Sequence, residues 1–101
     1  MDAVRTDVEQ LIRKEYLASN LQFPLFHSQH EGYAVMLEEI DELEDEMKMV
    51  RFHSRILWDE IKRSVEDIDL SAVRNHALNA AIEAIQVAAM CDKFVASGEK
   101  E

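Results

Sequence analysis

The sequence predicts an all-α protein of three main helices, and three observations carry this prediction. Only two Gly and one Pro occur in 101 residues, so the chain has few breaks and its helices are expected to be long. Apolar residues recur at three- and four-residue spacing, whereas the alternation typical of a β-strand is absent. Hydrophobic residues make up 48% and charged residues 32%, a mixture that suits a helical bundle and argues against disorder.

The length and charge of the chain limit its organisation and its partners. Residues 1–101 are expected to form one domain with a modest core, which small helical chains often complete by self-association. A net charge of −10 argues against a nucleic-acid polymer as partner. A single Cys, Cys91, excludes a disulfide within the chain, and no signal peptide or membrane-spanning segment is recognised. We therefore expect a cytoplasmic protein that does not bind membranes.

The first helix is expected over about Asp2–Ser19, where apolar residues share one side of an amphipathic pattern. A connector over residues 19–28 follows and holds Pro24. Its side chains are too apolar for a solvated loop, so we expect them to pack over one end of the bundle or to line the mouth of a pocket. These apolar residues are Leu21, Phe23, Leu25 and Phe26.

The second helix is expected to begin at a capping box formed by Ser28 and Glu31. Its apolar stripe keeps close to a seven-residue rhythm from Met36 to Ile68, which predicts one long, heptad-like central helix to about Asp67. A bend at residues 51–54 is the alternative. Such a helix is longer than a bundle built from one chain of this size, so its far half is expected to pack on a partner subunit.

The third helix is expected to begin at a cap formed by Asp69 or Ser71, to run to about Ala96 and to end at Gly98. Residues 97–101 are then expected to form a solvated tail.

Acidic residues crowd one side of the second helix between Glu38 and Glu46. At about 100° per residue, Glu39, Glu42 and Glu46 fall in one narrow sector beside the apolar stripe. A carboxylate pair at positions i and i+3 can grip a hard cation, although a solvated acidic face explains the same pattern.

A polar line crosses the otherwise apolar third helix at His76, Asn79, Glu83 and Gln86. A buried carboxylate needs a cation, a hydrogen-bond network or water as a partner. Without one, its burial costs roughly several kcal/mol, or the carboxylate takes up a proton. A hydrogen-bonded network of Glu83 with Asn79 and Gln86 is one solution.

The alternative is a metal site. If the two helices are antiparallel, Glu39 and Glu42 face Glu83. Three converging carboxylates then predict a site for Mg²⁺, or for Mn²⁺, of the kind that grips di- and triphosphates.

Two segments, HEGYAVMLEEIDELEDE at residues 30–46 and EAIQVAAM at residues 83–90, resemble the MazG-like branch of the all-α nucleoside triphosphate pyrophosphatases. The resemblance implies Mg²⁺-dependent cleavage of a nucleoside triphosphate to monophosphate and pyrophosphate by a homo-oligomer. Glu39 and Glu42 match the first metal-binding pair of that family. Glu83 matches the first acid of the second pair, but Gln86 stands where the family has Asp. The 40 residues between Glu42 and Glu83 also exceed the usual gap.

The resemblance and the helix register together give the expected site. Glu39, Glu42 and Glu83 are expected to bind the metal, and Glu38, Glu39 and Glu42 to take part in catalysis. Substrate contacts are expected from Asn79, Gln86 and His30. Two other functions remain open: a non-catalytic helical oligomerisation protein, in which Asn79 and Gln86 fix helix register, and a nucleotide-binding protein without turnover.

Overall fold

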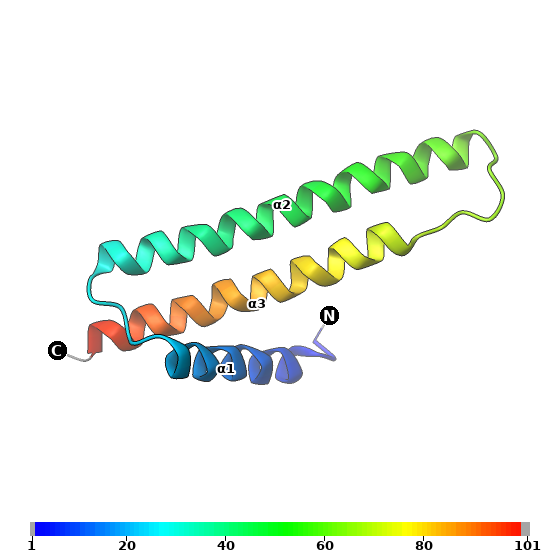
Figure 1. The fold of residues 1–101 in the computed structure, drawn as a ribbon. Coiled ribbons are helices and arrows are strands. Elements are labelled where there is room, and N and C mark those ends of the chain that lie inside the picture. The colour runs from blue at the N-terminus through cyan, green and yellow to red at the C-terminus, as the bar shows by residue number, and fades with distance from the viewer. Residues whose placement is uncertain (1, 100–101) are drawn as a thin grey trace.

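A computed structural model describes residues 2–99 as three α-helices, α1 (Arg5–Gln22), α2 (Gln29–Lys62) and α3 (Ser71–Glu99) (Figure 1). These residues contain no strand, so the predicted all-α class with three helices is confirmed. α2 and α3 form a long antiparallel hairpin, and α1 lies along the C-terminal half of α3 (Figure 1). The molecule extends over 61 × 29 × 22 Å.

α1 begins and ends three residues later than the sequence predicted, so the connector covers residues 23–28 rather than 19–28. Pro24 explains where the helix stops. A proline disfavours helical backbone at the residue before it, and Phe23 is extended, with φ −134° and ψ 145°. Leu21 therefore belongs to α1, where it is exposed.

α2 begins where the sequence predicted. The Ser28 hydroxyl accepts a hydrogen bond from the Glu31 backbone N–H at 3.1 Å and caps the helix. The Glu31 carboxylate reaches back to the N–H of His27, at 3.4 Å, rather than to that of Ser28. The helix is continuous through residues 51–54, where the Ser54 hydroxyl donates to the Arg51 carbonyl at 2.8 Å.

α2 ends at Lys62, about five residues before the predicted end. Ser64 adopts a left-handed conformation with φ 56°. Its N–H donates to the Ile61 carbonyl, and the Val65 N–H donates to the Glu60 carbonyl, which is the hydrogen-bond pattern of a Schellman motif. Because this motif usually contains Gly, Ser64 could not be recognised from the sequence as its left-handed residue. Val65 and Ile68, the last positions of the predicted heptad rhythm, consequently lie in the loop.

α3 begins at Ser71. Of the two predicted caps, Asp69 holds a backbone N–H at the helix start: its carboxylate accepts a hydrogen bond from the Ser71 N–H at 2.9 Å. That bond lowers the pKa of Asp69 below its ordinary value. The helix does not stop at Gly98, which has no left-handed φ, but continues to Glu99. Residues 97–99 are therefore helical rather than part of a tail, and residues 100–101 of the predicted tail lie outside the described residues.

The tightest packing lies where the start of α2 meets the end of α3. Phe26 is 6% exposed and packs over this end of the bundle, as expected for the connector, whereas Phe23, which was expected to pack with it, is 62% exposed. Gly32 is buried against Phe26 and Phe94, and a Cβ at Gly32 would lie 2.6 Å from Phe94 Cδ2. The two helices approach closely here because Gly32 has no side chain. Ala89 and Lys93 complete the buried group.

Elsewhere the described chain leaves much apolar surface uncovered, including Trp58 and Leu78, which are more than half exposed. Two long helices and one shorter helix cannot enclose a larger core by themselves. None of the helices described for residues 2–99 combines the length and the apolar character needed to cross a membrane.

Candidate functional site

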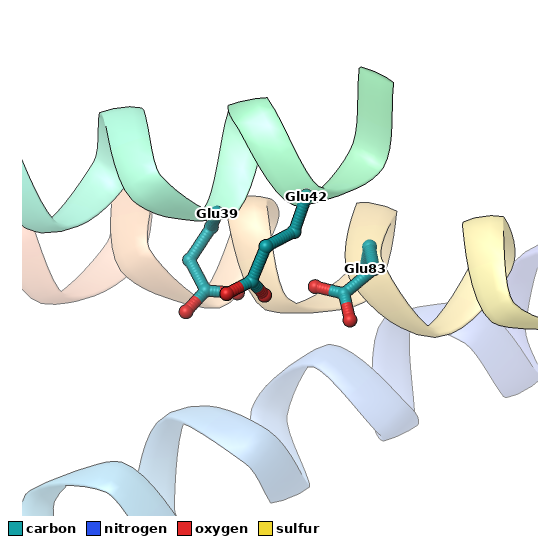
Figure 2. Close-up of side chains that lie close together, drawn as sticks. All are labelled: Glu39, Glu42 and Glu83. Atoms are coloured by element: carbon teal, nitrogen blue, oxygen red, sulfur yellow. The ribbon is translucent and has the colours of Figure 1, made fainter. Parts of the chain in front are cut away.

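Three carboxylates meet between the middle of α2 and the middle of α3. Glu39 and Glu42 extend from α2 toward Glu83 on α3 (Figure 2). One carboxylate oxygen from each residue lies within 4.8 Å of those of the other two. The antiparallel helices thus bring together acids with 40 or more residues between them, in the arrangement predicted from helix register.

The crowding of these carboxylates changes their acidity. Partial burial, with hydrogen bonding and charge from Glu42, raises the pKa of Glu83 to about 7. Burial also raises the pKa of Glu39, and the charge of Glu42 adds to this effect. The group therefore carries more negative charge than its surroundings stabilise, and it holds a proton near neutral pH when no cation is bound.

Gln86 lies on α3 one turn after Glu83 and contacts two of the three carboxylates, those of Glu39 and Glu83. Its two neighbours are carboxylate oxygens, so the amide is assigned with Nε2 toward them, and Nε2 then donates to Glu83 Oε2 at 2.9 Å and to Glu39 Oε2 at 2.8 Å. The Gln86 side chain thus offers its nitrogen, not its oxygen, to the two acids. It stabilises their charge by hydrogen bonding and adds no charge of its own.

The donor set of this group fits a hard divalent cation. Carboxylate oxygens are the ligands that Mg²⁺ and Mn²⁺ prefer, whereas zinc sites usually contain nitrogen or sulfur. Glu39 and Glu83 are half-buried and Glu42 is exposed, so solvent can reach the third acid and complete a coordination shell. The raised pKa of Glu83 marks a charge imbalance that a cation would relieve.

A cavity of about 490 Å³ lies beside the carboxylates, where α1, the connector, α2 and α3 meet. It shares Glu39 and Gln86 with the carboxylate group, and Glu38 lines it as well. The remaining wall is mixed, with apolar side chains from the connector and polar groups from α1. Among these lining residues are Glu15, Gln22, Phe23, Phe26, Met90 and Lys93.

Lys93 is the buried cation of this wall, with 2% of its surface exposed. Its Nζ donates to the Ser19 hydroxyl at 2.9 Å and to the Phe23 carbonyl at 3.5 Å, and it lies 5.2 Å from the centre of the Phe26 ring. Burial lowers its pKa, and the nearby Glu31 charge opposes that shift. Lys93 thereby fixes the end of α1 and the connector against α3.

A second polar contact joins the hairpin toward its far end. His76 Nδ1 lies 2.7 Å from Glu46 Oε2, and the His76 ring stacks on that of His53 at 5.4 Å between centroids. Glu46 therefore shares the α3-facing side of α2 with Glu39 and Glu42, as its position in the sequence indicated.

The other predicted site residues are dispersed. Glu38 is exposed at the cavity, whereas Asn79 is exposed on α3. His30 lies nine residues before Glu39 on α2, about 13 Å along the helix axis. It lines a separate cavity of about 540 Å³ with Phe26, Phe94 and Ser97. The structure thus places Gln86 with the carboxylates and leaves His30 apart from them.

Sequence reasoning missed Lys93 and Glu15. Lys93 is the only Lys or Arg between residues 77 and 95 of the apolar α3, and that isolation was a usable signal for a buried cation. Glu15 gave no comparable signal, because its place at the cavity depends on how α1 packs.

Comparison with protein-family models, curated proteins and solved structures finds no match to the chain. The resemblance to the pyrophosphatases therefore stays a prediction that rests on the quoted residues.

Proposed function

We propose that the protein is a Mg²⁺-dependent nucleoside triphosphate pyrophosphohydrolase. The observation that supports this most directly is the convergence of Glu39, Glu42 and Glu83 across the α2–α3 hairpin. The order of acids along the chain also resembles that of the MazG-like enzymes, with a pair on one helix and Glu83 at the first acid of the second pair, where Gln86 replaces the second acid.

Glu39, Glu42 and Glu83 would hold Mg²⁺ or Mn²⁺. A bound ion of this kind offsets the charge of phosphate oxygens and polarises a water molecule. Without the ion, an acidic group in a chain of net charge −10 repels a triphosphate. Loss of the carboxylates is therefore expected to abolish substrate binding as well as turnover.

The residues around the ion would orient the water and take up its proton. Glu38, exposed beside the group, and Glu42, the exposed member of the group, suit this role, since an ionised carboxylate accepts a proton from an attacking water. The water oxygen bonds to phosphorus, the bridge between the α- and β-phosphates breaks, and the products are a monophosphate and pyrophosphate. The proton that the water loses passes to the carboxylate and then to solvent.

The 490 Å³ cavity would take the nucleoside. It adjoins Glu39 and Gln86, and its volume lies within the range of about 300–1,000 Å³ that is usual for small-molecule sites. Phe23 and Phe26 of the connector offer apolar surface to a base, and Gln86 and Gln22 offer amides. His30 and Asn79 stay predicted substrate contacts, although neither lines this cavity.

The proposal also includes a homo-oligomer, a dimer or tetramer, and a cytoplasmic location. Self-association is supported by the uncovered apolar surface of the hairpin. That same surface favours a second candidate function, a helical assembly protein in which the acidic face only provides solubility.

An assay for released pyrophosphate with a panel of nucleoside triphosphates and Mn²⁺ or Mg²⁺ tests the proposal. We expect turnover of at least one nucleotide by the wild type and its loss in Glu39→Gln and Glu83→Gln. Asp41→Asn is the matched control, because Asp41 is an exposed acid of the same helix and should leave activity unchanged. Equal activity in Glu83→Gln and the wild type would contradict the assignment of these carboxylates as the active site.

A melting experiment with increasing Mg²⁺ separates the candidate functions. An enzyme site predicts a rise in Tm that Glu83→Gln removes and Asp41→Asn keeps. Metal and nucleotide binding without pyrophosphate release would identify a binding protein without turnover. A Tm that does not respond to Mg²⁺ would favour the assembly protein.

A further inference from the structure

Lys93 is buried in the wall of the 490 Å³ cavity without the acid that a buried lysine usually has as its partner. No ion pair found within residues 2–99 includes it. Its neighbours are the hydroxyl of Ser19, the carbonyl of Phe23 and the ring of Phe26, all of them neutral. The fixing of α1 against α3 therefore does not by itself explain why a charged residue occupies this position.

The ammonium group of Lys93 also has donor capacity to spare. It carries three N–H donors, and the hydrogen bonds to Ser19 Oγ at 2.9 Å and to the Phe23 carbonyl at 3.5 Å use two of them. The third N–H has no acceptor within the part of the chain that the structure describes. A molecule in the cavity that offers an acceptor atom to Lys93 would complete its hydrogen bonding.

Glu31 supplies an acceptor on the wall of the same cavity, from the first turn of α2. Burial lowers the pKa of Lys93, and the charge of Glu31 opposes that shift, so the two groups lie near enough to interact although they form no ion pair. The Glu31 carboxylate accepts one hydrogen bond, from the His27 N–H at 3.4 Å, and can accept more. The cavity thus presents a donor and a nearby acceptor to its occupant.

The position of Lys93 along α3 determines which part of a nucleotide would reach it. Lys93 lies ten residues after Glu83, about 15 Å along the helix axis, and beyond Gln86 as seen from the carboxylates. With the phosphates at the carboxylates, the sugar follows and the base points toward Lys93. The group at C6 of a purine, or at C4 of a pyrimidine, is remote from the sugar and meets Lys93. The ring nitrogen beside it meets Glu31.

This edge divides the bases into two classes. Guanine, hypoxanthine, uracil and thymine carry a carbonyl oxygen there, next to a ring N–H. Adenine and cytosine carry an amino group, next to a ring nitrogen that has no hydrogen. An ammonium donates to the carbonyl oxygen and a carboxylate accepts from the ring N–H, whereas the amino class opposes donor to donor and lone pair to carboxylate. Contacts from lysine or arginine to O6 of guanine are correspondingly common in nucleic-acid recognition.

We propose that Lys93 and Glu31 select nucleotides whose base carries a carbonyl at C6 of a purine or C4 of a pyrimidine. Lys93 donates to that oxygen, and Glu31 accepts the hydrogen bond of the adjacent ring N–H. This inference rests on the proposed function, because the phosphates must bind at the three carboxylates for the base to reach Lys93. It adds the class of base and assigns two residues to its recognition.

Two pairs of nucleotides that differ only at this edge test the proposal on the wild type. ITP and ATP form one pair, and UTP and CTP form the other. With Mn²⁺, kcat/KM for pyrophosphate release should favour ITP over ATP and UTP over CTP by at least about tenfold, as expected for one hydrogen bond to a charged group. An equal or reversed preference in the pair that is cleaved faster would overturn the proposal.

Replacing Lys93 with Met separates recognition from structural support, because Met keeps an unbranched apolar side chain and removes the donor. The ratio of kcat/KM for ITP to that for ATP should fall by at least about tenfold. A purely structural Lys93 would lower both values equally and leave the ratio unchanged, which would contradict its role in selection. Lys48→Met is the matched control, since Lys48 is exposed on α2 and does not line this cavity.

Binding of α,β-methylene analogues distinguishes this inference from the proposed function, because their α–β bridge resists cleavage. Isothermal titration calorimetry in Mg²⁺ should show that the wild type binds the guanosine analogue at least about tenfold more tightly than the adenosine analogue, and that Lys93→Met loses this difference. That result without pyrophosphate release from any nucleotide would contradict the enzyme and keep the base selection. Turnover or binding without base preference would contradict the selection alone. If neither analogue binds, both proposals are wrong.

Discussion

Gln86 Nε2 donates a hydrogen bond to Glu39 Oε2 at 2.8 Å and so links the middle of α3 to the middle of α2. The same nitrogen donates to Glu83, the acid one turn earlier on α3, at 2.9 Å. A neutral amide at this position holds two carboxylates in place, where an acid would add a fourth negative charge. Gln86 therefore stabilises the three carboxylates when no metal is bound. Its replacement by an acid should favour the metal-bound state.

Replacing Gln86 with Glu should destabilise the metal-free protein and strengthen metal binding. The variant loses hydrogen bonds to charged groups and gains a repelling charge, so we expect its free energy of unfolding in EDTA to fall by about 2 kcal/mol. In Mg²⁺ the added carboxylate becomes a ligand, and the Tm should recover. Thermal melts in EDTA and in Mg²⁺, read by circular dichroism, provide the measurement.

The matched control is Gln22→Glu, which adds the same charge at an exposed position of the neighbouring cavity wall. It should change the response to Mg²⁺ less than Gln86→Glu does. If Gln86→Glu binds Mg²⁺ no more tightly than the wild type, the assignment of the carboxylates as a metal site is wrong.

The stability of the metal-free protein should depend on pH through Glu83. Its pKa is about 7 in the folded chain and near the ordinary value of 4.5 when unfolded, so the folded state binds the proton more tightly between those values. This contribution to stability is fully present below the unfolded pKa and is lost as pH rises through about 7. Melts of the wild type and Glu83→Gln in EDTA at pH 5 and pH 8 measure it.

Glu83→Gln cannot lose a proton, so its stability relative to the wild type should increase from pH 5 to pH 8. Saturating Mg²⁺ should reverse the order at pH 8, because the ion stabilises only the wild type. A stability difference that does not change with pH would show that Glu83 titrates normally.

The parts of the fold that the sequence predicted are those set by local pattern. Ser28 and Glu31 marked the start of α2, and the register of Glu39, Glu42 and Glu83 followed from helix geometry once the hairpin was assumed. The end of α2 was not predictable in this way. Ser64 adopts a left-handed φ that its residue type does not favour, so only the geometry of the loop reveals it.

What the sequence could not place depends on how distant segments pack. His30 stays a predicted substrate contact, and helix rise puts it about 13 Å along α2 from Glu39. The burial of Lys93 depends on Ser19 and Phe23, which lie at least 70 residues earlier, and no local pattern encodes such a contact.

Replacing Gly32 with Ala should destabilise the protein, although alanine is the better helix former. The new Cβ would lie 2.6 Å from Phe94 Cδ2 and 3.0 Å from Phe26 Cδ2, so the aromatic rings would have to move. We expect the free energy of unfolding to fall by about 1–2 kcal/mol, as for other overpacked sites. Urea denaturation gives the change directly.

Gly98→Ala is the control for that substitution, because a Cβ at Gly98 meets no atom within 4 Å. It should leave stability unchanged or raise it by up to about 1 kcal/mol through helix propensity. Equal effects of the two substitutions would contradict the close approach of α2 and α3 at Gly32.

Replacing Ser64 with Gly should stabilise the protein without touching the carboxylates. Ser64 holds φ at 56°, where a Cβ costs about 1–2 kcal/mol, and Gly removes that cost while adding about 0.5–1 kcal/mol of backbone entropy to the unfolded chain. The net gain is expected to be about 0.5 kcal/mol, which corresponds to a rise in Tm of roughly 2–4 °C for a domain of this size. Ser64→Ala keeps the Cβ and should give no rise. If both variants melt at the wild-type temperature, Ser64 does not form the left-handed end of α2, and α2 continues toward Asp67 as its apolar rhythm suggested.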